Sequence, residues 1–75
     1  MADTPLVRAS RHVAEGAKII ARQRAIIFKL RQSGQDARGA VELLEAFESC
    51  QRIFEKHRLS LLNEMGLIAS HRRGK

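Results

Sequence analysis

The chain has 75 residues, a formal net charge of +6 and a single cysteine. A chain of this length forms at most one domain and buries a smaller share of its surface than a larger domain does. The lone Cys50 excludes an intrachain disulfide, and the three histidines are too widely spaced in the sequence to form a zinc ligand set. We therefore expect no metal or other cofactor, and expect stability to come from association with another chain.

The charge is unevenly distributed along the chain. Residues 1–33 carry a net +5, residues 34–66 carry −2 and residues 67–75 carry +3. We therefore expect the basic half and the acidic half to face each other. There is no signal-peptide pattern and no run of about 20 apolar residues, so we expect a cytoplasmic protein without a membrane span.

Helical periodicity covers the first half of the chain, from about residue 5 to residue 33. Thr4 and Pro5 are typical of an N-cap followed by proline in the first helical turn. Val13, Ile20 and Ile27 follow at intervals of seven, the spacing of a coiled-coil seam. The pattern stops before Gly34, a residue type that favours the left-handed conformation just past a helix end.

A second helix is expected over residues 37–65, with Asp36 as its N-cap. Phe47, Phe54 and Leu61 again recur every seven residues, with Leu43 one turn before them. Two helices of equal length joined by a few polar residues fold back antiparallel. The predicted fold is an all-α, antiparallel two-helix hairpin over residues 1–66, followed by a basic, disordered tail at 67–75. Its predicted core is Val13, Ile20, Ile27, Leu43, Phe47, Phe54 and Leu61.

The apolar arc of each helix is wider than the stripe that one neighbouring helix covers. Five large apolar residues remain outside the predicted core and form the candidate dimer interface. Because exposed apolar surface of this extent usually marks an interface, we expect two hairpins to associate into a homodimeric four-helix bundle. A monomer or a complex with a different protein remains open. The five residues are Ile19, Ile26, Phe28, Ile53 and Leu62.

The run "RHVAEGAKIIARQRAIIFKLRQSGQD", followed by "LLEAFE", resembles a group of short bacterial proteins to which no activity is assigned. Those proteins pair an opening R-H-V/I-A-E-G with A-R-Q-R, a Gly/Asp turn and a second helix containing LL-x-x-F. The likeness covers about residues 11–65. It implies a helical hairpin and a bacterial origin, and it implies no catalytic or binding role for any residue.

The residue patterns of enzymes and metal proteins are absent from the sequence. No glutamate has a histidine three residues later, and there is no HExxH, CxxC or glycine-rich phosphate loop. Cys50 is expected on the core side of its helix, as a small buried apolar residue. His12 and His57 are placed to approach each other across the hairpin, without a third ligand. We expect neither catalysis nor metal binding.

Five cations form a basic stripe on the first helix, within about 80° of one another on a helical wheel and over about 32 Å of its length. The main expectation is a small protein-interaction module that forms homodimers and binds other proteins. The alternative is an RNA- or DNA-binding regulator that contacts phosphates through this stripe. Membrane-surface binding would need the apolar arc that the bundle is expected to bury. The stripe is Arg8, Arg11, Lys18, Arg22 and Lys29.

Overall fold

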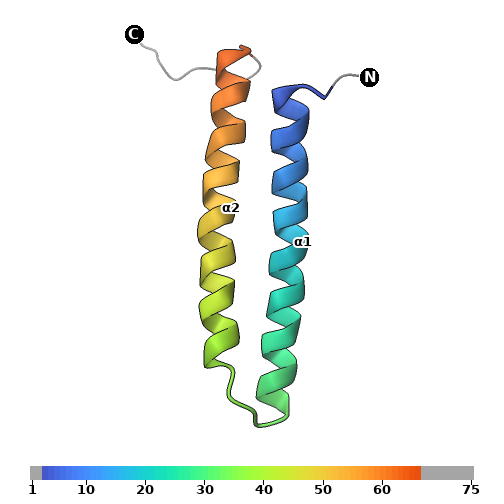
Figure 1. Cartoon of the computed structure of the whole chain (residues 1–75), viewed down its shortest axis with the longest axis vertical. Helices are drawn as coiled ribbons and strands as arrows, with labels where there is room; N and C mark the ends of the chain where they lie inside the picture. Colours follow the sequence, from blue (N-terminus) through green and yellow to red (C-terminus); the bar gives the residue numbers. More distant parts are fainter. Residues whose placement is uncertain (1–2, 67–75) are drawn as a thin grey trace.

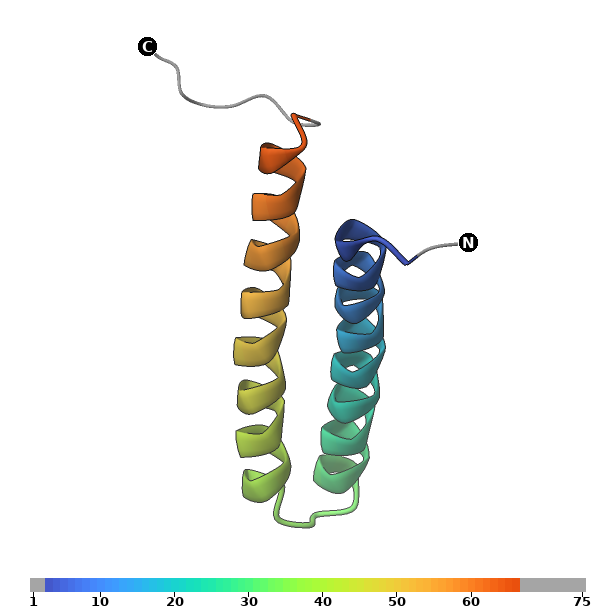
Figure 2. The same ribbon diagram turned by 45° about the horizontal axis from the view of Figure 1, so that its top comes forward.

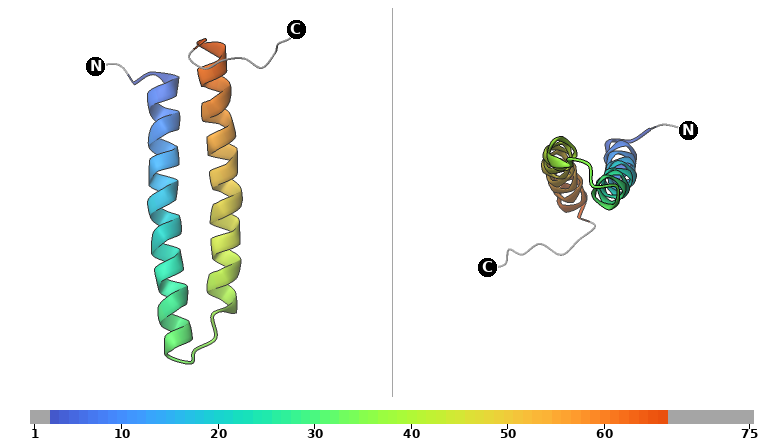
Figure 3. Two further views of the ribbon diagram at one scale, coloured as in Figure 1. Left: turned by 180° about the vertical axis from the view of Figure 1, so that it is seen from behind. Right: turned by 90° about the horizontal axis from the view of Figure 1, so that it is seen from below.

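The computed structural model describes residues 3–66, which form two helices and no strand. Helix α1 covers Pro5–Gln32 and helix α2 covers Arg38–Glu64. The helices lie side by side in opposite directions, with the short turn at one end and the start of α1 and the end of α2 at the other (Figures 1 and 2). Seen along the helices, they form a single layer (Figure 3). The predicted tail at 67–75 lies outside the described residues.

Helix α1 begins and ends as the local sequence predicts. The Thr4 side chain accepts a hydrogen bond from the backbone N–H of Val7 at 3.1 Å, and Pro5 is the first helical residue. After Gln32 the chain leaves the helix through Ser33 and Gly34, and Gly34 has a φ of 72°. Backbone bonds from Gly34 to Arg31 and from Gln35 to Leu30 then close the helix end.

Helix α2 begins one residue later than the sequence indicated. Its N-cap position is Ala37, whose methyl side chain cannot accept a capping hydrogen bond. Asp36 instead accepts from the backbone N–H of Arg38 at 3.0 Å and forms a salt bridge with the Arg38 guanidinium at 2.8 Å. Asp36 therefore satisfies a free N–H group from just outside the helix. At the far end, Gly66 has a φ of 73°, the second left-handed helix stop.

The two helices meet along a seam with the heptad spacing of a coiled coil. On α1, positions 6, 13, 20 and 27 alternate with positions 9, 16, 23 and 30, and all eight are buried or half-buried. On α2, positions 40, 44, 47, 51, 58 and 61 follow the same spacing and are also buried or half-buried. The seam therefore fixes which face of each helix points toward the other.

Two glutamines occupy the seam, although neither belongs to the core predicted from the sequence. Gln23 and Gln51 are only 6% and 7% exposed. The Gln23 side-chain amide donates to the carbonyl of Ala40 at 2.9 Å, and that of Gln51 donates to the carbonyl of Val13 at 2.8 Å. Each glutamine thus links the two helices through a hydrogen bond to the backbone of the other helix.

The core of the single hairpin is thin. Among the described residues, only Ala9 and Ile27 are buried apolar residues, and no large side chain is fully buried. Of the predicted core, Ile27 is buried, whereas Val13, Ile20, Phe47 and Leu61 are half-buried. Phe54 is 36% exposed. Placing Leu43 in the core was wrong: it is 47% exposed, because the next residue, Leu44, takes the seam position.

Candidate interaction surfaces

Residues that directly precede seam positions 13, 20 and 27 of α1 and seam positions 44, 51 and 58 of α2 come to one side of the hairpin. A step back of one residue turns the side chain by about 100° around the helix, and in an antiparallel pair these steps lead to the same side on both helices. On α1 this side carries Ile19 and Ile26, and on α2 it carries Leu43 and Cys50, all four of them exposed. We call this surface, with His12 and His57 toward its end at the chain termini, the aliphatic side.

The aromatic ring of His12 belongs to this surface. Its centroid lies 5.2 Å from that of Phe54, with the two rings tilted by 39°. His12 therefore packs on the exposed edge of the seam. The aliphatic side carries no Lys, Arg, Asp or Glu at any of its six positions, and Arg22 and Lys29 border it on α1, one turn from Ile19 and Ile26.

The opposite side of the hairpin is charged. Its central feature is a salt bridge between the helices, in which Arg24 of α1 contacts Glu48 of α2 at 3.1 Å. Further from the seam, Phe28 borders a shallow hollow next to Arg24, Arg31 and Val41. We call this surface the charged side, defined by Arg24, Arg31, Glu48 and Glu55. It has only one ion pair between the basic and acidic halves of the chain within residues 3–66.

The five residues predicted as the dimer interface do not form one surface. Only Ile19 and Ile26 lie on the aliphatic side. Phe28, 61% exposed, borders the charged side, because it follows the seam residue Ile27 whereas Ile26 precedes it. Leu62 is half-buried in the single hairpin. Ile53 lies on the outer face of α2, where it lines a hollow with Arg52 and Leu59.

Two residues of the aliphatic side were assigned to the core from sequence. Leu43 and Cys50 are exposed, and each precedes a seam residue, Leu44 and Gln51. The sequence does contain a signal for this correction, because Gln23 and Gln51 stand at heptad positions of the seam. We did not assign them to the core, because the core was predicted from apolar residues alone.

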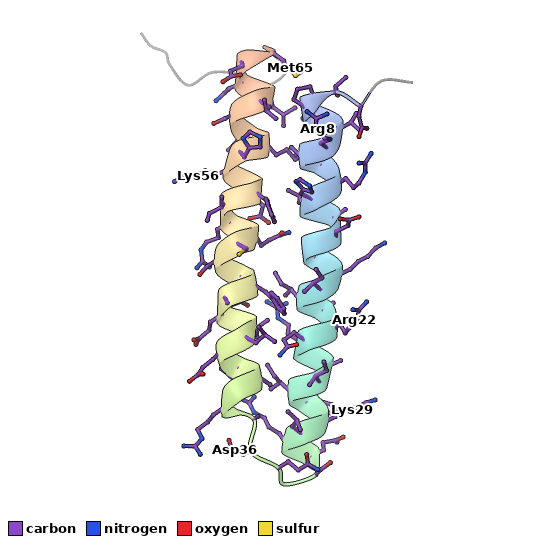
Figure 4. The ribbon with its side chains drawn as sticks, in the orientation of Figure 1. Arg8, Arg22, Lys29, Asp36, Lys56 and Met65 are labelled. Atoms are coloured by element: carbon purple, nitrogen blue, oxygen red, sulfur yellow. The ribbon has the colours of Figure 1, made fainter. Side chains whose placement is uncertain are left out.

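The basic stripe of α1 covers the outer face of the helix and the flank next to the aliphatic side, because Arg8, Arg22 and Lys29 directly precede seam residues. All five of its residues are exposed. Figure 4 shows Arg22 and Lys29 extending away from α2. Near the start of α1, the Asp3 carboxylate binds the Arg11 guanidinium at 3.0 Å, and the Asp3 carbonyl accepts from Arg8 at 2.9 Å. The hydrogen bonds from Arg11 lower the pKa of the Asp3 carboxyl below its ordinary value.

Neither metal-binding nor membrane-spanning features occur in the part of the chain that the structure describes. Residues 3–66 hold no group of three or more His, Cys, Asp or Glu side chains that could bind a metal ion. Neither α1 nor α2 combines the length and apolar composition that crossing a bilayer requires.

The described fold is that of an all-helical antiparallel hairpin, with an aliphatic side, a charged side and a basic outer face on α1. Comparison with known proteins found no matching family model, no matching curated protein and no matching solved structure. Any function must therefore be inferred from the surfaces of the hairpin.

Proposed function

We propose that the protein is a non-enzymatic interaction module that forms a homodimer through its aliphatic side, giving a four-helix bundle. The observation that carries the proposal is the clustering of Ile19, Ile26, Leu43 and Cys50 on one uncharged side. In a four-helix bundle each helix contacts two neighbours, so the seam and one flanking side become buried. The aliphatic side is the flank that suits this role.

The charged side is the poorer candidate for the same contact. A second hairpin placed there would remove Arg24 and Glu48 from water, and the desolvation of two charges offsets most of their mutual attraction. On the aliphatic side, Ile19, Ile26 and Leu43 are 41%, 42% and 47% exposed. Burying the exposed part of each side chain would contribute about 1 kcal/mol.

The thin core gives the second reason for a partner. Within residues 3–66, two of the four buried residues are glutamines, so the single hairpin buries little large apolar surface. Short chains without disulfides or metals commonly obtain the missing burial by association. A second copy is the simplest partner, because a two-fold axis lets the same uncharged surface cover itself. The lone thiol of Cys50 suits a reducing cytoplasm.

The test is the solution mass, measured by light scattering after gel filtration over a range of concentrations. We expect the wild type to have twice the mass of the 8.5 kDa chain. Ile26→Glu places a carboxylate on the aliphatic side and is expected to give a monomer. Phe28→Glu is the matched control two residues away: it removes a more exposed apolar side chain from the margin of the charged side, and its dimer should persist.

Leu43→Glu tests the same surface from α2, and circular dichroism reports whether each variant stays helical. A helical monomer for Ile26→Glu and Leu43→Glu, with a dimeric Phe28→Glu, supports the proposal. The proposal fails if the wild type is a monomer at every concentration. It also fails if Phe28→Glu dissociates the dimer while the two variants on the aliphatic side do not.

A further inference from the structure

The outer face of α1 carries more positive charge than its surroundings neutralise. Lys18 lies two residues from the seam residue Ile20, about 200° around the helix. Arg22 and Lys29 directly precede the seam residues Gln23 and Leu30, so they lie between the outer face and the aliphatic side. Figure 4 shows that both extend away from α2. Within residues 3–66, none of these three cations has a carboxylate within salt-bridge distance.

Glu15 is the only acidic residue of α1 itself. The unpaired cations Lys18, Arg22 and Lys29 extend over about 16 Å of a straight helix, and the stripe from Arg8 to Lys29 extends over about 32 Å. Cations held in a row on a rigid helix are suited to a ligand whose negative charges also form a row. A polymer of phosphodiesters has this property, with one charge per about 1.7 Å of duplex axis.

We propose that the outer face of α1 binds the phosphate backbone of a nucleic-acid duplex without reading its base sequence. The residues that make the contact are Lys18, Arg22 and Lys29, with Arg8 and Arg11 extending the surface toward the start of the helix. The chain has no Trp and no Tyr, and its three Phe residues lie outside this face. Single-stranded nucleic acid is bound largely by stacking bases on aromatic rings, so a duplex fits better.

This surface is present in a single hairpin and does not depend on the proposed dimer. A dimer would present two copies of it. The two proposals fail separately when the dimer is broken from α2: Leu43→Glu would remove the dimer without placing a carboxylate beside the cations of α1, whereas the carboxylate of Ile26→Glu would lie one turn from Arg22 and Lys29.

The test measures binding to fluorescent DNA and RNA duplexes of about 20 base pairs, longer than α1, by anisotropy over a series of salt concentrations. For the full chain we expect a dissociation constant of about 10⁻⁴ to 10⁻⁶ M near physiological salt, typical of contacts to phosphates alone. We expect log K to fall with log salt concentration at a slope of about −3 or steeper. Binding of either duplex in this way supports the proposal.

The deciding variant is Lys18→Gln/Arg22→Gln/Lys29→Gln, which should reduce the salt slope by about 2.7 if three phosphates are no longer neutralised. Its matched control is Arg38→Gln/Arg52→Gln/Lys56→Gln, which removes the same charge from outside the stripe; Figure 4 shows Lys56 pointing away from α1. The control should keep most of the affinity. All proteins keep residues 67–75, so Arg72, Arg73 and Lys75 contribute equally.

Three outcomes would overturn the proposal. The first is that the wild type binds neither duplex at low salt. The second is an equal loss of affinity in the two triple variants, which would mean that total charge matters and the stripe does not. The third is binding to vesicles of anionic lipid that depends on Lys18, Arg22 and Lys29 while duplex binding does not, which would assign the stripe to a membrane surface.

Discussion

The side-chain amide of Gln51 lies directly against Gly16, so that a Cβ atom on residue 16 would occupy the space of the Gln51 oxygen. The same amide donates to the carbonyl of Val13 at 2.8 Å, while its oxygen is buried without a hydrogen-bond partner within residues 3–66. A glycine in the middle of α1 and a glutamine in the middle of α2 are therefore coupled: each residue type is tolerated because of the other.

Gly16→Ala tests this coupling. Alanine is favoured over glycine in a helix interior by about 1 kcal/mol. At residue 16 we expect the opposite result, because the displaced Gln51 amide loses its hydrogen bond, at a cost of about 1–3 kcal/mol. The expected net effect is a loss of about 1 kcal/mol in the free energy of unfolding, measured by thermal denaturation at fixed protein concentration. Gly39→Ala, where nothing lies within 4 Å of the added Cβ, is the control and should stabilise slightly.

The sign of the Gly16→Ala effect should reverse when Gln51 is first replaced by alanine. With the amide gone, the added methyl group has room and helix propensity decides the outcome. If Gly16→Ala stabilises the protein even with Gln51 present, the proposed coupling is wrong.

Gly34→Ala is expected to destabilise the turn. Gly34 has a φ of 72°, and alanine in the left-handed region costs about 1–2 kcal/mol. Because nothing lies within 4 Å of a Cβ at this position, the loss comes from backbone strain alone. Gly34→Asn should recover part of it, since asparagine tolerates this conformation better. Equal unfolding free energies for the alanine variant and the wild type would contradict the left-handed turn.

The reactivity of Cys50 reports whether the aliphatic side is covered. Cys50 is exposed in the single hairpin, so a monomer should react readily with a thiol-alkylating reagent. If a second copy covers this side, the alkylation rate should fall as the protein concentration rises, whereas in Ile26→Glu it should stay high. A Cys50→Ser/Lys56→Cys variant places the thiol on the outer face of α2, and its rate should not depend on concentration. A rate for Cys50 that does not depend on concentration in the dimeric wild type would place the interface elsewhere.

Asp3 forms a salt bridge with Arg11 at the start of the basic stripe, so the proposed phosphate contact predicts that Asp3 competes with phosphate there. Asp3→Asn removes the carboxylate that holds Arg11, so we expect tighter duplex binding and a salt slope steeper by about 0.9 for each additional phosphate that the protein neutralises. Asp36→Asn makes the same change of charge at Arg38, outside the stripe, and should have a smaller effect. A larger increase in affinity for Asp36→Asn would argue against the stripe as the binding surface.

The salt bridge between Asp3 and Arg11 also predicts how the effect of Asp3 on duplex binding depends on pH. Because Arg11 lowers the pKa of Asp3 below its ordinary value, the carboxylate stays ionised and paired above that ordinary value, and the pairing is lost as the pH falls through the lowered pKa. The ratio of duplex affinities between Asp3→Asn and the wild type should therefore stay constant from about pH 8 down to about pH 4, where an ordinary aspartate would already be half protonated. A ratio that has moved halfway toward one near pH 4 would contradict the lowered pKa.

The helices and the turn follow from local sequence, and the structure places their ends within one residue of the prediction. Thr4, Pro5 and Gly34 act through the backbone of their own segment, so their roles are visible without knowing what the helix contacts. The intervals of seven from Val13 to Ile27 also predicted the correct face of α1. The second helix was less well predicted, because Leu43 and Leu44 are adjacent and of equal hydrophobicity.

The sequence by itself determined two helices of equal length, their connection and the basic outer face of α1, because helix caps, glycine conformation and a period of 3.6 residues are local properties. Only the tertiary structure decided the rest: that Gln23 and Gln51 lie in the seam, that Leu43 and Cys50 lie outside it, and that Ile26 and Phe28 lie toward opposite sides. The physical reason is that a helical wheel gives the angle of each residue around its own axis. Which angle faces the other helix depends on packing between the two, where the close approach of Gly16 made room for a glutamine.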